Sequence, residues 1–149
     1  MRQRMIVGVI VLLAGVAMPG FAEGPWSWFH PKSIIIIGGR DSGGHPTASP
    51  ELLRAQCIEA ALEMSKSFPG EQNGIAIFWS PRGPAIETLP EHWKALKRGL
   101  QDAVKILGGP DKLIFISWVF SPEARQEIRR ELGINIGTFN FEYWRMGKT

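Results

Sequence analysis

The chain has 149 residues, of which 44% are hydrophobic, and its 17 basic and 14 acidic residues give a net charge of +3. This length suits one domain with an apolar core of its own. The small charge is not gathered into a basic block, which argues against a nucleic-acid partner. The single cysteine, Cys57, excludes an intrachain disulfide and is expected to be a small buried hydrophobe.

The N-terminus has the pattern of a secretory signal peptide. Arg2 and Arg4 precede the apolar run Ile6–Met18, and small residues lead up to Ala22. We expect residues 1–22 to be removed on export, which would leave a periplasmic or secreted protein without a membrane attachment. The alternative is that the segment stays as an uncleaved anchor.

The remaining chain is expected to form one domain with short extensions. Residues 23–32 form an aromatic arm, residues 33–141 a single α/β domain, and residues 142–149 a C-terminal tail. The arm contains Trp26 and Trp28, which we expect to cover part of the fold because exposed aromatic clusters promote aggregation.

The domain begins with four consecutive isoleucines, Ile34–Ile37. A β-branched run without polar alternation predicts a strand buried on both faces. Further strands are predicted over 74–79, 113–120 and 134–141.

Helices are predicted between these strands. Ser49 caps a helix that runs to Ser67, and Ser121 caps one that ends at Gly133. Thr88 and Glu91 have the spacing of a capping box and open the helix between them in the chain, which ends at Gly108.

The resulting order, β-α-β-α-β-α-β, predicts a three-layer α/β/α fold. Its sheet has four mostly parallel strands, because a helix between two buried strands requires a crossover. The simplest strand order is 2-1-3-4, with the isoleucine strand beside the strand over 113–120. The chain then leaves these two strands in opposite directions, and a crevice opens between the loops that follow them.

We expect a binding site in that crevice. The glycine-rich loop lets backbone amides approach a ligand, and Arg40 can grip a carboxylate or phosphate with two hydrogen bonds. The alternative is that the glycines serve only a tight surface turn. The candidate ligand-binding residues are Gly39, Arg40, Asp41, Ser42, Gly43, His45, Arg82 and Ser121.

The residue pattern predicts neither a metal site nor a cofactor. His30, His45 and His92 lie in separate segments, and no phosphate-binding or dinucleotide-binding motif occurs. No complete catalytic set is visible, so no catalytic residue is assigned. The favoured function is therefore a non-enzymatic binding or assembly protein of the cell envelope.

The partner would be an envelope protein or a small anionic ligand. Replacing Arg40 and Asp41 with alanine should then abolish capture and leave the melting temperature nearly unchanged. The alternative from a different class is a small hydrolase or transferase that acts on an anionic substrate through Ser42 or Asp41.

The segment Phe78–Pro84, with Glu87 and Pro90 after it, resembles the strand-to-helix segment of exported thioredoxin-like proteins. The resemblance implies a thioredoxin-like module, in which Ser80 and Pro81 would begin a helix. Both redox cysteines are absent, which excludes thiol–disulfide exchange. A cysteine-less assembly module is therefore a further alternative.

Overall fold

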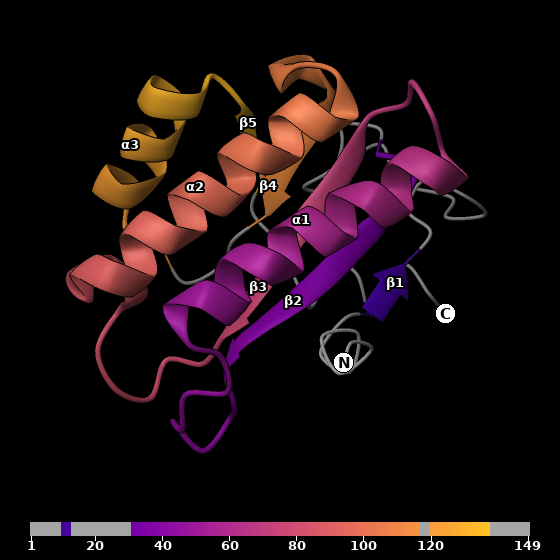
Figure 1. Cartoon of the computed structure of the whole chain (residues 1–149). Coiled ribbons are helices and arrows are strands. Elements are labelled where there is room, and N and C mark those ends of the chain that lie inside the picture. The colour runs from indigo at the N-terminus through magenta and orange to yellow at the C-terminus, as the bar shows by residue number, and fades with distance from the viewer. Residues whose placement is uncertain (1–9, 13–30, 117–119, 138–149) are drawn as a thin grey trace, which may run out of the picture.

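The computed structural model describes residues 10–12, 31–116 and 120–137. Four parallel strands form the body of one sheet, and the short strand β1 (Ile10–Leu12) pairs antiparallel with its outer strand (Figure 1). The predicted α/β class with a four-stranded parallel sheet is confirmed. The parallel strands, in their order across the sheet, are β2 (Ile34–Arg40), β3 (Asn73–Trp79), β4 (Leu113–Ile116) and β5 (Asn135–Gly137).

Three α-helices connect these strands, and two short 3-10 helices precede α2 and β4. Contacts join α1 to α2, and α2 to α3. The helices are α1 (Pro50–Ser67), η3 (Ile86–Thr88), α2 (Pro90–Leu107), η4 (Pro110–Lys112) and α3 (Pro122–Leu132).

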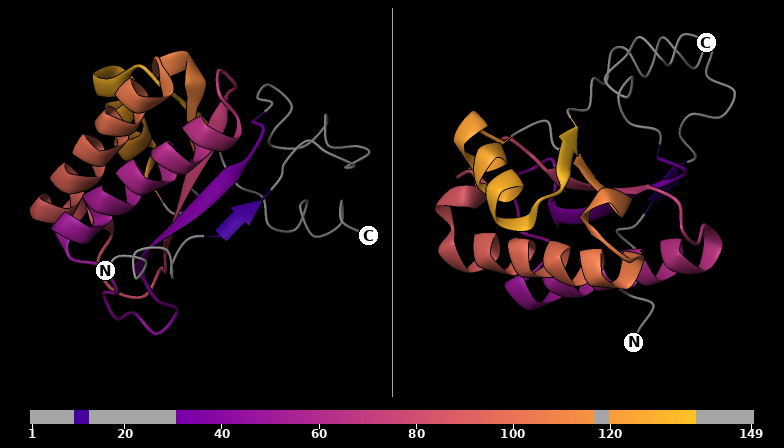
Figure 2. Two further views of the ribbon diagram at one scale, coloured as in Figure 1. Left: turned by 45° about the vertical axis from the view of Figure 1, so that its right-hand side comes forward. Right: turned by 90° about the horizontal axis from the view of Figure 1, so that it is seen from above.

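The expected strand order, 2-1-3-4, is wrong. β3 lies between β2 and β4, so the isoleucine strand is the border of the parallel set, and among the described strands β1 is its neighbour on the outer side. Each crossover joins neighbouring strands in the same direction, and right-handed connections then place successive helices on one side of the sheet. Two views show α1 and α2 on the same side (Figure 2). The described helices thus form one layer, not one layer on each face.

The core lies between this helical layer and one face of the sheet. Alternate residues of the strands, such as Ile35, Ile37 and Phe115, face α1 and α2 and are fully buried. On the opposite face Ile34, Ala76 and Ile114 are buried too, whereas Ile36 is half-buried and Phe78 is exposed. The strands are therefore apolar on both faces, which explains why their sequences do not alternate.

The helices α1 and α2 pack closely at a glycine. A Cβ atom placed on Gly99 would lie 2.8 Å from Cβ of Cys57 and 2.9 Å from its Sγ. Burial, with a smaller effect from the charge of Asp102, raises the pKa of Cys57 to about 12. The thiol therefore stays protonated at neutral pH, and Cys57 is the buried hydrophobe that was predicted.

Two of the three predicted helix caps are present. The Ser49 and Ser121 hydroxyls accept hydrogen bonds from the amides of Leu52 and Ala124. The predicted capping box at Thr88 is wrong, because the Thr88 hydroxyl donates to the Ala85 carbonyl and α2 begins two residues later. The residues before α2 form η3, which uses the threonine for its own turn.

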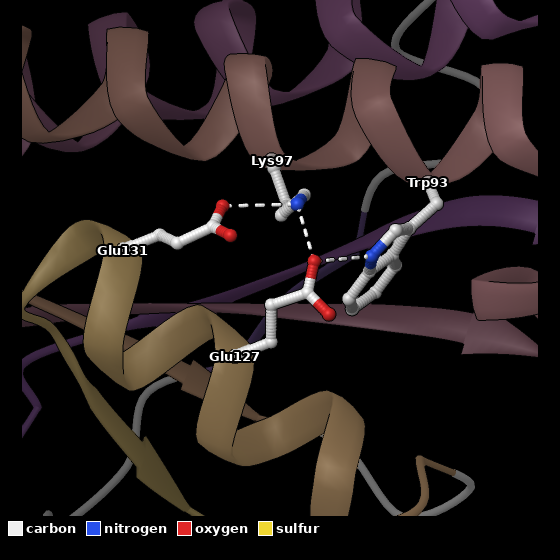
Figure 3. Close-up of polar contacts among 4 residues, drawn as sticks. All are labelled: Trp93, Lys97, Glu127 and Glu131. Carbon is white, nitrogen blue, oxygen red and sulfur yellow. Dashed lines mark hydrogen bonds and ion pairs between the residues drawn. The ribbon is translucent and has the colours of Figure 1, made fainter.

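A polar cluster joins α2 to α3. Lys97 Nζ lies 2.5 Å from Glu127 Oε2 and 2.9 Å from Glu131 Oε1, and Trp93 Nε1 donates to the same Glu127 oxygen (Figure 3). The hydrogen bonds from Lys97 and Trp93 lower the pKa of Glu127. Burial lowers the pKa of Lys97, but its bonds to the two glutamates outweigh this effect and the net shift is upward. The charged pair therefore stabilises the packing of α3 on α2.

Several sequence predictions fall outside the described residues. These are the signal peptide over 1–22 apart from β1, the aromatic arm up to residue 30, and the tail over 142–149. None of the helices in the described ranges is sufficiently long and apolar to cross a bilayer.

We predict that Gly99→Ala lowers the free energy of unfolding by about 1–2 kcal/mol, measured by urea denaturation. The added methyl gains helix propensity but pushes α2 away from Cys57, and overpacking outweighs the gain. Gln101→Ala, at an exposed position of the same helix, should change stability little. Equal stabilities for Gly99→Ala and the parent would show that the two helices are not in close contact there.

We predict that Glu127→Gln lowers stability by about 1 kcal/mol near pH 7. Because the pKa of Glu127 is lowered on folding, its contribution is present above the unfolded-state value and is lost as pH falls through the folded-state value. The difference between parent and variant should therefore shrink between about pH 7 and about pH 3. Glu63→Gln, on the exposed side of α1, should show no such pH-dependent difference in urea denaturation.

Candidate ligand-binding site

A bulge at the end of β2 determines where Arg40 points. Ile35 and Ile37 pair with Ile75 and Ile77 of β3, but the register shifts after Gly38 so that Arg40, not Gly39, is the partner of Trp79. One extra residue moves a side chain to the other face of a sheet. Arg40 therefore shares the helix-covered face with Trp79.

Neighbouring side chains fit this bulge closely. The Gln56 amide of α1 accepts from Gly38 N at 3.0 Å and donates to Gly38 O at 2.8 Å, which satisfies backbone groups of the strand end. A Cβ on Gly39 would lie 2.6 Å from the Trp79 ring, so a glycine is required there. Gly39 is thus a packing residue of the candidate site.

The Arg40 guanidinium is buried and holds the loop that follows β3. Arg40 is 3% exposed, and its terminal nitrogens donate to the carbonyl oxygens of Ser80 at 2.6 Å and Pro84 at 2.5 Å. Its Cζ lies 4.5 Å from the centre of the Trp79 ring. The two terminal nitrogens are therefore already used within the fold, and Arg40 does not offer them as a free fork for an anion.

No carboxylate of the described residues lies within ion-pair distance of Arg40. Burial lowers its pKa, which reflects the cost of taking this cation out of water. The guanidinium is stabilised by carbonyl dipoles and by the face of Trp79, but its charge is not neutralised by a neighbour.

A cavity of about 170 Å³ lies beside Arg40. Three of the residues that line it each contribute a buried polar atom without a hydrogen-bond partner in the described structure: Arg40 Nε, Ser80 Oγ and Glu87 Oε1. Buried polar atoms are nearly always paired with protein, water or ligand. These three atoms have almost no accessible surface, so a ligand in the cavity would pair with the donor, the hydroxyl and the acceptor after small shifts of the surrounding side chains.

The glycine-rich loop after β2 folds onto its own carboxylate. Asp41 Oδ1 accepts from the amides of Gly43 at 3.0 Å and His45 at 2.8 Å, and Gly44 N donates to Asp41 O. These bonds, led by the one from His45 N, lower the pKa of Asp41. The amides that were expected to hold a ligand are thus bonded to Asp41, as in the tight surface turn considered as the alternative.

The other candidate residues are placed around this loop rather than in the cavity. Ser42 is exposed, and the His45 side chain is 81% exposed, with Nδ1 3.5 Å from Asp41 Oδ1. Arg82 is exposed but does reach the loop, since a Cβ on Gly44 would lie 3.1 Å from Arg82 Cβ.

Ser121 is connected to the cavity through one neighbour. Its amide nitrogen lies 3.3 Å from Glu87 Oε2, and its hydroxyl is used to cap α3. The expected crevice between the loops after β2 and β4 does not form, because β3 separates those strands.

Sequence reasoning missed three residues of the cavity: Trp79, Ser80 and Glu87. All come from the end of β3 and the segment after it, which lies next to β2 in both the predicted and the observed strand order. One sequence feature could have indicated them: the acidic residue Glu87 lies in a segment rich in proline and glycine before α2.

The rest of the described structure contains no stronger candidate for a binding site. An open hollow between the first turns of α1 and α2 is lined by residues of both charges, among them Glu51, Arg54 and Lys94. No group of three potential metal ligands occurs in the described ranges.

Comparisons with known proteins give no relative for this chain. No family model matches it, and neither the curated proteins nor the solved structures contain a significant match.

We predict that Arg40→Ala lowers the free energy of unfolding by about 2–3 kcal/mol, because it leaves the Ser80 carbonyl oxygen and the Trp79 ring without their partner and the Pro84 carbonyl oxygen with only the bond from Trp79 Nε1. This corrects the expectation that the melting temperature would barely change. Arg82→Ala is the matched control and should be neutral, since Arg82 is exposed. Thermal denaturation of both variants tests the assignment, and equal melting temperatures would contradict it.

Proposed function

We propose that this protein is an exported, non-enzymatic binding protein that holds a small ligand through an anionic group at Arg40. The observation that carries the proposal is a buried cation without a carboxylate partner among the described residues, beside a cavity with unpaired polar atoms. An anion would neutralise the guanidinium and accept from Arg40 Nε, and charge-assisted hydrogen bonds of this kind are among the strongest.

The size of the cavity favours a small ligand over a protein partner. Sites for drug-sized ligands begin at about 300 Å³, and this cavity has about 170 Å³. Exposed Pro81 and Gly83 are among its lining residues, so a small molecule could enter from solvent without a large rearrangement.

Three observations support a binding role over catalysis. Ser42 has no described contact with His45, the His45 ring is exposed, and Asp41 Oδ1 is already an acceptor for two amides. A nucleophile needs a base held within hydrogen-bond reach and a third group that orients the base. The hydrolase or transferase alternative therefore has no arrangement of described residues in its favour.

The thioredoxin-like alternative gains no support either. Ser80 and Pro81 lie in a loop well before α2 begins at Pro90, not at a helix N-terminus. The last two described strands, β4 and β5, are parallel rather than the arms of a hairpin.

The proposed location depends on the sequence of residues 1–22 alone. Mass spectrometry of the protein recovered from the envelope of an expressing cell tests it, with a mature chain beginning at Glu23 as the expected product.

Ligand binding is tested with Ser80→Ala and Ser42→Ala. The Ser80 hydroxyl is buried and unpaired, so its removal should leave the fold as stable as before or more so. Its loss should weaken the binding of small anions such as acetate or phosphate by about tenfold, because a hydrogen bond to a charged group is lost. Calorimetric titration measures both affinities.

Ser42→Ala is the matched control, since it removes an exposed hydroxyl from the neighbouring loop. Unchanged anion affinity is expected for it. The proposal is wrong if the parent binds no small ligand with an anionic group, or if Ser80→Ala binds as tightly as the parent. Ester or phosphoester hydrolysis that disappears in Ser42→Ala would instead establish the enzymatic alternative.

A further inference from the structure

The cavity beside Arg40 also contains a second charge of opposite sign. Glu87 is the middle residue of η3, and its two side-chain oxygens have different surroundings. Oε2 lies 3.3 Å from the amide nitrogen of Ser121, whereas Oε1 is buried without a partner. A carboxylate oxygen only accepts hydrogen bonds, so Oε1 requires a donor.

The two charged residues of the cavity lack hydrogen-bond partners of opposite kinds. Arg40 Nε is a donor without an acceptor, and Glu87 Oε1 is an acceptor without a donor. No ion pair joins the two side chains in the described structure. No other charged residue lines the cavity, so its lining is neutral overall.

A simple anion would pair with Arg40 but not with Glu87. It would neutralise Arg40 but enter a small space that Glu87 shares, where like charges repel strongly because little water separates them. A ligand with a carboxylate at one end and an ammonium group at the other meets both demands and brings no net charge into the cavity. The Ser80 hydroxyl can donate to the carboxylate.

We propose that the ligand of this cavity is a small zwitterion of amino-acid size, with its carboxylate at Arg40 and its ammonium group at Glu87. This inference rests on the proposed binding function and specifies the ligand class of the same site. The limited volume selects a ligand with few non-hydrogen atoms, and charge pairing at both ends supplies the specificity.

The test compares three probes on the purified parent chain: alanine, propionate, which lacks the amino group of alanine, and ethylamine, which lacks its carboxylate. Alanine is expected to bind at least about tenfold more tightly than propionate, since it adds a charge-assisted hydrogen bond. Ethylamine should bind more weakly than alanine, because it leaves Arg40 without an anion. Calorimetric titration gives the three affinities without any substitution.

A second experiment repeats these titrations with the variant Glu87→Gln. The glutamine oxygen can still accept from the Ser121 amide, so the helix cap should persist, and the melting temperature checks this. The preference for alanine over propionate should collapse to about twofold or less in this variant. A preference that persists would overturn the role assigned to Glu87.

The outcomes separate this inference from the function on which it rests. Propionate binding as tightly as alanine would overturn the zwitterion and leave anion binding at Arg40 in place. Failure of alanine, propionate and phosphate to bind would overturn both. Ethylamine binding as tightly as alanine would remove Arg40 as the anchor, and with it both proposals.

Discussion

A buried guanidinium has to be solvated by the protein, and the end of the sheet is arranged to do this for Arg40. The bulge after Gly38 turns the side chain toward the helices, Trp79 lies beneath it, and the loop after β3 presents two carbonyl oxygens. Gly83 has a positive φ of 93°, and a Cβ there would lie 3.0 Å from Arg40 Nη1, so both the backbone and the packing of the loop favour glycine at this position. The geometry of the cavity thus follows from the position of one cation.

Local signals predicted most of the elements because they act within a few residues. Serine side chains at Ser49 and Ser121 cap the helices that they precede, and Gly108 and Gly133 end helices in the left-handed conformation that glycine tolerates. The failure at Thr88 has the same origin. The hydroxyl could cap α2 or close the turn of η3, and spacing alone does not distinguish these bonds.

Strand order was not predictable in this way, because a row of isoleucines buried on both faces is compatible with a central or a border position. Pairing with β3 on one side and β1 on the other places β2 at the border of the parallel set. The predicted site changed accordingly. Arg40 keeps a place beside a cavity, whereas Ser121 reaches it only through Glu87, and the partners of Arg40 come from the end of β3. The bulge has no sequence signal beyond adjacent glycines, which are equally common in turns.

The binding proposal is independent of how the N-terminal segment is processed. β1 lies within the residues expected to be removed on export, and it pairs with Ile34–Ile36 at the start of β2. The cavity is lined by Arg40 and by residues 79–87, at the opposite end of the same strand. Removal of residues 1–22 would therefore expose the outer edge of β2 and leave every lining residue of the cavity in place. An edge strand opened in this way needs a new partner or protection from pairing, but the charge balance between Arg40 and Glu87 would not change.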